Sequence, residues 1–102
     1  MNSRLENLWA VVRRIPSGRC ASYGDVGRAL DHPISGLLVG RWMRLCPDPE
    51  DIPWWRVVLK NGGIATDKLD PELGLLQRRR LDAEGVPLTD DRVDMERAGW
   101  TP

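Results

Sequence analysis

The sequence predicts a mostly α-helical protein of 102 residues with one small β-hairpin. Three features of the pattern predict this fold class. Apolar residues recur at helical spacing near the start, two shorter helical segments with a tight turn between them follow, and an Asn-Gly pair later separates two short apolar runs. Because a chain of this length can bury only one modest core, we expect a single domain over residues 1–102.

The first expected helix covers residues 3–14. Its apolar residues recur three or four positions apart and therefore share one face, with arginines on the other face. These apolar residues are Leu5, Leu8, Trp9, Val12 and Ile15. The segment Pro16-Ser17-Gly18 then favours a turn that ends the helix.

Two short helices are expected next. Ser22 and Asp25 form a capping-box pattern, which predicts a helix from there to about Leu30. A turn before Pro33 predicts a third helix with this proline at its first position, running to about Leu45. Two short helices joined by a tight turn indicate a helix-turn-helix, in which the later helix is the recognition element.

The expected hairpin is centred on Asn61-Gly62. Residues 55–59 and 63–66 flank this pair, and Asn-Gly suits the two-residue turns of β-hairpins. Following a helix-turn-helix, such a hairpin would be the wing of a winged helix-turn-helix.

A last long helix is expected in the C-terminal third. Asp70-Pro71-Glu72 combines an N-cap, a first-turn proline and an acid, and Gly85 favours the end of the helix. The residues expected to face inward are Leu73, Leu76 and Leu81. The tail over residues 86–102 is less regular, and Val93 and Trp100 are expected to hold it against the body.

Composition and charge suit a soluble protein with one basic half. Apolar residues make up 41% and charged residues 29%, and no apolar run approaches the ~20 residues that a membrane span needs. Residues 1–46 hold seven arginines and three acids, whereas residues 47–102 are acidic overall. The basic half could face phosphates, although a solvated helix face gives the same pattern. The first residues lack a signal-peptide pattern, so we expect a cytoplasmic protein and, by default, a monomer.

Neither the cysteines nor the histidine predict a metal site or a cofactor. Cys20 and Cys46 lie in unlike contexts without a CxxC motif, and a disulfide is not expected in a cytoplasmic chain. His32 stands alone beside a proline, as in many turns.

The stretch Ile52-Pro53-Trp54-Trp55-Arg56-Val57 resembles the Ile-Pro-Cys-His-Arg-Val active-site signature of the O6-alkylguanine-DNA alkyltransferases. Tryptophan in place of the cysteine marks the non-enzymatic alkyltransferase-like branch. Further motifs follow in the family's order, namely Ile15-Pro16-x-Gly18-x-Cys20-Ala21-Ser22-Tyr23-Gly24, Val39-Gly40, Leu76-Gln77-Arg78-Arg79-Arg80-Leu81 and Ala83-Glu84-Gly85. The resemblance implies a winged helix-turn-helix-like domain that binds O6-alkylguanine in double-stranded DNA by base flipping and flags it for nucleotide excision repair proteins.

The resemblance also implies which residues form the site. The lesion pocket is expected from Trp54, Trp55, Arg56, Val57, Asp67 and Lys68, with backbone groups after Arg56 reading the purine edge. Base flipping and DNA binding are expected from Ser22, Tyr23, Gly24, Leu37, Gly40, Arg41 and Arg44. Phosphate contacts are expected from Arg13, Arg14, Arg28, Arg41 and Arg44. Tyr23 falls on the tyrosine that rotates the phosphate 3′ of the target, and Glu84 is expected to hold Arg56 as a structural partner.

Departures from the family's pattern decide the expected chemistry. Trp54 and Trp55 stand at the positions of the acceptor cysteine and activating histidine, and Cys46 stands at that of an asparagine, so no enzyme is expected. Leu37 stands at the position of the arginine finger, where an apolar wedge can also fill a vacated stack, and Arg41 could supply the lost charge. Asp67 stands where some relatives have a pocket arginine.

Two other functions stay open at this point. A winged-helix regulator that has lost the lesion pocket would prefer one duplex sequence and ignore alkylation. A thiol transferase would use Cys46 or Cys20, and alkylated DNA would leave its alkyl group on the protein.

Overall fold

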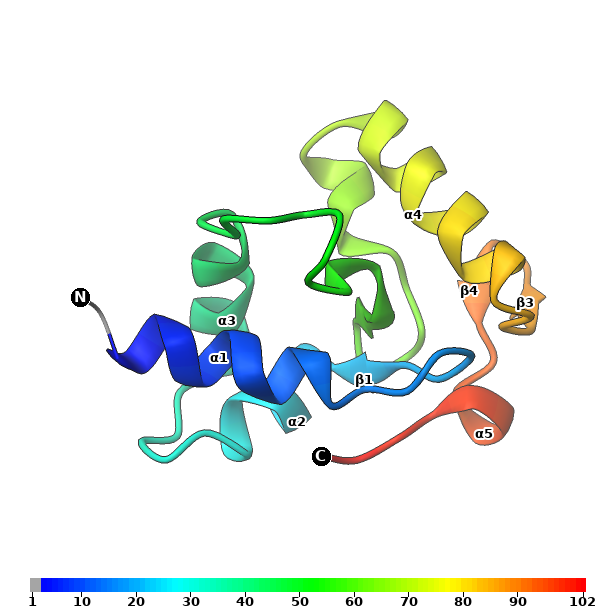
Figure 1. Ribbon diagram of the computed structural model, residues 1–102. Helices are drawn as coiled ribbons and strands as arrows, with labels where there is room; N and C mark the ends of the chain where they lie inside the picture. The colour runs from blue at the N-terminus through cyan, green and yellow to red at the C-terminus, as the bar shows by residue number, and fades with distance from the viewer. Residues whose placement is uncertain (1–2) are drawn as a thin grey trace.

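The computed structural model describes residues 3–102 as short helices joined by two small pairs of strands (Figure 1). In chain order the elements are α1 (Ser3–Arg13), β1 (Ala21–Ser22), α2 (Tyr23–Arg28), α3 (Gly36–Met43), the 3-10 helix η1 (Trp54–Arg56), β2 (Val57–Val58), the 3-10 helix η2 (Ala65–Lys68), α4 (Pro71–Ala83), β3 (Leu88–Thr89), β4 (Arg92–Val93) and α5 (Met95–Ala98). Figure 1 shows α1, α2 and α3 together at one end and α4, β3 and β4 at the other. Within the described residues, no helix is both long and apolar enough to span a bilayer.

The N-terminal end has its own core. The apolar face expected for residues 3–14 is confirmed, because Leu8, Trp9 and Val12 of α1 are buried against α2 and α3. Ile15 is also fully buried, and Trp100 of the C-terminal tail packs on the same cluster. The tail is therefore held to the body as expected.

The helix-turn-helix is present, but its second helix begins later than predicted. Ser22 caps α2 by accepting a hydrogen bond from the Asp25 backbone N–H, as the capping pattern indicated. Pro33, however, lies before α3, which begins at Gly36 with Ser35 as its N-cap. The Ser35 hydroxyl accepts from the Leu38 N–H at 3.2 Å, so a side chain rather than a proline sets the start. The backbones of Gly36 and Gly24 approach so closely that a Cβ on Gly36 would lie 2.9 Å from the Gly24 nitrogen.

The hairpin expected over residues 55–66 was wrong. The valines of β2 pair in parallel with β1, in the register Ala21 with Val57 and Ser22 with Val58, and residues 65–68 form a 3-10 helix. Asn61-Gly62 makes only a tight loop, which is closed by the Leu59 N–H bonded to the Gly63 carbonyl at 3.0 Å. Residues 57–58 therefore pair with the distant strand β1 rather than with the segment that follows Asn61-Gly62.

The antiparallel hairpin lies instead near the C-terminus, where β3 pairs with β4. Its turn holds Asp90 and Asp91 at φ 53° and 63°. Two successive positive φ angles match the favoured two-residue hairpin turn, which aspartate tolerates better than most residues. The Asp-Asp pair is a weaker signal than Asn-Gly, which explains why the sequence favoured the other position.

α4 begins as predicted but buries different residues. Asp70 caps it by accepting from the Glu72 N–H, with Pro71 in the first turn. Leu81 is fully buried, but Leu76 is 39% exposed, whereas Gln77 is fully buried. A second core cluster lies beneath this helix and includes Cys20, Val58, Ile64, Leu81, Val86, Val93 and Ala98.

Candidate functional site

Two adjoining cavities form one groove beside α3. The larger cavity, of about 620 Å³, lies between α3 and the segments around residues 59–60 and 65–69. The smaller cavity, of about 420 Å³, reaches Trp54 and the exposed side of α4. Both have five lining residues in common, namely Tyr23, Gly40, Arg44, Thr66 and Leu69. The two cavities therefore adjoin one another, and we refer to them together as the groove.

Most residues expected to bind DNA and flip the base lie around the larger cavity. Six of the seven line it, namely Tyr23, Gly24, Leu37, Gly40, Arg41 and Arg44. Ser22 does not, because it is 5% exposed and caps α2. Burial raises the pKa of the Tyr23 phenol, so the hydroxyl is protonated and can donate at neutral pH. Leu37 stands 72% exposed at the rim.

Uncompensated positive charge lines the groove. Arg41, Arg44, Lys60 and Lys68 all line the larger cavity, and none of them has an acidic partner among residues 3–102. Two other arginines expected to contact phosphate are paired within the protein: Arg13 lies 2.9 Å from Asp51, and Arg28 pairs with Asp25. The groove is thus a lined cavity in which a polyanion can neutralise cations that have no acidic partner within the described part of the protein.

The six residues expected to form the lesion pocket lie in different places. Trp54 lines the smaller cavity and Lys68 the larger one. Asp67 faces α4, where its carboxylate accepts two hydrogen bonds from Arg78 at 2.7 Å each. These bonds lower the pKa of Asp67. The remaining three, Trp55, Arg56 and Val57, line neither cavity.

A hydrogen bond from its indole N–H holds Trp54 in the wall of the smaller cavity. Its indole Nε1 donates to the Pro49 carbonyl at 3.0 Å. The ring meets that of Trp55 edge to face, with centroids 6.0 Å apart and an interplanar angle of 89°. Adjacent residues of a 3-10 helix point in different directions, so one indole reaches the cavity while the other turns towards α4.

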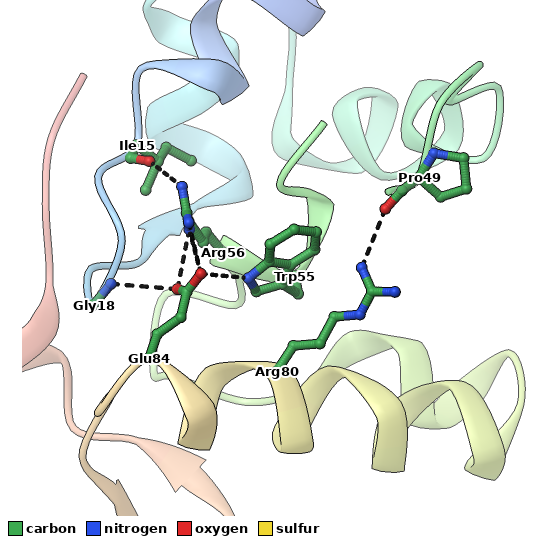
Figure 2. A network of polar contacts seen from close by, with 7 residues as sticks. All are labelled: Ile15, Gly18, Pro49, Trp55, Arg56, Arg80 and Glu84. Carbon is green, nitrogen blue, oxygen red and sulfur yellow. Dashed lines mark hydrogen bonds and ion pairs between the residues drawn. The ribbon is translucent and has the colours of Figure 1, made fainter. Parts of the chain in front are cut away.

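Behind the cavity wall lies a bridge between Arg56 and Glu84 (Figure 2). The Arg56 Nη2 is 2.6 Å from the Glu84 Oε2, its Nε donates to the same carboxylate, and its Nη1 donates to the Ile15 carbonyl at 2.8 Å. The carboxylate also accepts from the Trp55 Nε1 at 3.1 Å and the Gly18 N–H at 3.3 Å. Arg56 therefore bonds both Glu84 and a loop carbonyl, as predicted for a structural residue.

The environment of Glu84 keeps it ionised. Burial by itself would raise the pKa of this carboxyl, but the hydrogen bonds from Arg56, Trp55 and Gly18 outweigh burial and lower it. Both partners are largely buried, with side chains 16% and 14% exposed. The bridge joins the loop after α1, η1 and the end of α4.

The backbone groups of Val57, directly after Arg56, are hydrogen-bonded within the protein. Val57 is fully buried and paired with β1, and its carbonyl accepts from the Gln77 Nε2 at 3.1 Å. The same amide donates to the Trp55 carbonyl, and the Thr66 hydroxyl donates to the Gln77 Oε1 at 2.6 Å. This internal network, rather than a purine edge, engages the backbone that was expected to read the base.

Neither cysteine is activated as a nucleophile. Burial, with a smaller contribution from the Glu84 charge, raises the pKa of Cys20 to about 12. Cys46 lies in the wall of the smaller cavity, and burial likewise raises its pKa. Residues 3–102 contain no group of three or more His, Cys, Asp or Glu side chains placed to hold a metal ion.

Sequence reasoning missed several lining residues, above all Arg80 on α4. Its guanidinium lies 4.8 Å from the Trp55 ring centroid and donates to the Pro49 carbonyl at 3.2 Å. A signal existed, because Arg80 stands four residues before Glu84 and so shares its helical face. Leu69 and Thr66, which line both cavities, gave no comparable signal.

Comparison with known proteins identifies what the chain resembles. Residues 4–86 match the family of the 6-O-methylguanine DNA methyltransferase, DNA binding domain. The DNA base-flipping protein of Escherichia coli is 32% identical over 93% of this chain and 72% of its own length. The DNA base-flipping protein of Vibrio parahaemolyticus is 26% identical over the full length of both chains, 100% of each. The chain is also similar to the alkyltransferase-like protein of Schizosaccharomyces pombe, whose crystal structure is a complex with damaged DNA containing O6-carboxymethylguanine. The two structures superpose with a TM-score of 0.85 at 25% identity, over 100% of this chain and 98% of that one.

Proposed function

Because the chain belongs to the family of the 6-O-methylguanine DNA methyltransferase DNA-binding domain, we propose that it binds O6-alkylguanine in double-stranded DNA by base flipping and does not transfer the alkyl group. The observation that carries the proposal is the groove, in which four basic side chains without acidic partners among the described residues adjoin a cavity lined in part by Trp54. Phosphates bind the cations, and the extruded base enters the cavity.

Flipping is required because O6 is paired inside the duplex. Extrusion costs a few kcal/mol, and less when alkylation has weakened the pair, so the lesion is favoured before any contact is made. The smaller cavity falls within the range of about 300–1,000 Å³ found for ligand pockets. Its apolar lining includes Leu69, Leu73, Leu76 and Trp54, which suits a flat purine ring.

The roles at the rim follow from the lining of the larger cavity. Tyr23, beside Gly40, can place its hydroxyl against the phosphate next to the target. Leu37, which is 72% exposed, fills the gap left in the stack, as apolar wedges do in other DNA-bending proteins. Arg41 and Arg44 contact the flanking phosphates.

The absence of transfer follows from the residues at the acceptor and activating-histidine positions and from the protonation of the two cysteines. Trp54 and Trp55 stand where the family has its acceptor cysteine and histidine, and an indole supplies neither a nucleophile nor a general base. A thiolate is the nucleophilic form of cysteine, and the raised pKa values of Cys20 and Cys46 keep both thiols protonated. Binding is therefore reversible, and a monomer on bent DNA serves as the signal for nucleotide excision repair proteins.

The test is a fluorescence-anisotropy titration of matched duplexes that differ in a single O6-methylguanine, at one stated salt concentration. We expect the lesion duplex to bind at least tenfold tighter, which corresponds to about 1.4 kcal/mol. Equal binding would contradict the proposal and favour a regulator that prefers one duplex sequence. Alkyl label recovered on the protein would instead reveal a transferase.

A further inference from the structure

Arg80 lies between the two tryptophans of η1 and the acidic turn that precedes them. Its guanidinium is 4.8 Å from the Trp55 ring centroid and 5.8 Å from that of Trp54. Figure 2 shows the side chain extending from α4 past Trp55 towards the Pro49 carbonyl. Arg80 lines the smaller cavity, and so do Pro49 and Glu50, the two residues whose oxygens accept from its guanidinium.

Of the three consecutive arginines on α4, only Arg80 lines this cavity. Arg78 is engaged by the Asp67 carboxylate and the Asp91 carbonyl. Arg79 is exposed and lines neither cavity. Successive residues of an α-helix point about 100° apart, so the three arginine side chains of α4 lie in three different environments.

Arg80 can release its two partners, Glu50 and the Pro49 carbonyl, at little cost in stability. It pairs with Glu50 at 3.0 Å, but the Glu50 side chain is 81% exposed, and exposed pairs of this kind contribute little to stability. The Pro49 carbonyl keeps the hydrogen bond from Trp54 if Arg80 leaves. The turn is also closed by its own bonds, since the Asp48 carbonyl accepts from the Ile52 N–H at 2.9 Å.

The charges around the cavity favour an anionic or oxygen-rich guest. Its charged lining residues are Arg44, Arg80 and Glu50, and most of the others are apolar. Tyr23 and Cys46 also line it, and burial raises the pKa of each further above neutrality, so neither adds charge at pH 7. A guanidinium already stacked on aromatic rings is partly desolvated and presents a planar fork that matches a carboxylate.

We infer that Arg80 determines adduct specificity by selecting O6 adducts that end in a carboxylate over a methyl group. This inference rests on the proposed function. When such an adduct enters the cavity, the Arg80 guanidinium exchanges Glu50 for the adduct carboxylate. A methyl adduct offers no acceptor, so Arg80 stays with Glu50 and contributes nothing to its selection.

The experiment compares three duplexes, unmodified or carrying O6-methylguanine or O6-carboxymethylguanine, by anisotropy titration at one salt concentration. For the wild-type protein we expect carboxymethyl binding about tenfold tighter than methyl binding, or about 1.4 kcal/mol. Arg80→Gln should remove most of this ratio, whereas the matched control Arg79→Gln, with the same loss of charge on the same helix, should preserve it. Glu50→Gln should increase the ratio, because it removes the carboxylate that competes for Arg80.

The ratio between the lesions separates specificity from folding, since a partly unfolded protein loses both affinities together. An unchanged ratio in both Arg80→Gln and Glu50→Gln would overturn the inference. Equal binding of the two lesions by wild type, with both above the unmodified duplex, would overturn the inference but leave the proposed function intact. Equal binding of all three duplexes would overturn both.

Discussion

The groove and the Arg56–Glu84 bridge each include a residue of η1, Trp54 and Arg56 respectively, and they differ in how their charges are compensated. At the bridge, one guanidinium and one carboxylate are largely buried and hydrogen-bonded to each other and to neighbouring groups. In the groove, Arg41 and Arg44 are exposed and have no acidic partner within residues 3–102. Pairing and burial, rather than residue type, therefore distinguish Arg56, which holds the fold, from Arg41 and Arg44, which we propose contact DNA.

Breaking the bridge should have the largest effect. Arg56→Ala leaves Glu84 buried without its countercharge, and removing one partner of a buried pair typically costs about 3–5 kcal/mol. Urea unfolding should show this loss in the free energy of unfolding. Arg41→Ala, which removes an exposed arginine, is the control and should leave stability nearly unchanged. A similar small effect of both substitutions would abolish the distinction between the two regions.

Trp54→Ala tests the aromatic wall of the groove, because Trp54 lines the smaller cavity. Because stacking on an aromatic side chain is worth about 1–3 kcal/mol per base, we expect the preference for the alkylated duplex to fall by this amount. Affinity for the unmodified duplex, measured in the same anisotropy titration, serves as the control and should change little. An equal loss for both duplexes would mean that Trp54 supports the fold rather than the flipped base.

The double substitution Arg41→Ala and Arg44→Ala should weaken binding to every duplex alike. Each lost phosphate contact should reduce the slope of log affinity against log salt by about 0.9. The control is Arg13→Ala, since Arg13 already pairs with Asp51. A comparable change in the salt dependence of affinity for Arg13→Ala would show that an arginine paired within the protein still contacts phosphate.

Leu37→Ala should act on flipping with little effect on stability, because Leu37 is 72% exposed. Without the wedge, the vacated stack closes more readily over the gap. We expect a smaller signal from a fluorescent base analogue placed opposite the lesion, at saturating protein. An unchanged signal would remove the wedge role and leave Arg41 as the side chain that fills the gap.

The smallest effect is the dependence of stability on acid. Glu84 has a lowered pKa in the folded protein, so its contribution is present above the unfolded pKa of about 4.3 and is lost as pH falls through the folded value. Urea unfolding between neutral pH and pH ~3 should therefore show a declining free energy. Glu84→Gln should flatten this decline, and an equally steep decline in the variant would assign the acid sensitivity to other carboxylates.

The local parts of the fold could be predicted because their signals lie within one helical turn. The hydroxyl of Ser22 and the carboxylate of Asp70 cap the helices that follow them, as the patterns indicated. Here the sequence alone was sufficient, since a cap needs only neighbouring backbone N–H groups. The order of the motifs also assigned Tyr23, Leu37 and Arg41 to one DNA-binding site, and all three line the larger cavity.

Strand pairing and the partners of Gln77 and Asp67 depend on contacts between distant segments, which the sequence did not predict. β2 pairs with β1, 36 residues earlier in the register, instead of folding back across Asn61-Gly62. Gln77 is buried because three distant polar groups meet its amide, and Asp67 turns to Arg78 rather than to the pocket. Hydrogen-bond partners far apart in the chain leave no local pattern. The sequence therefore determined the helix caps and the residue types along the chain, while packing determined which side chains line the groove.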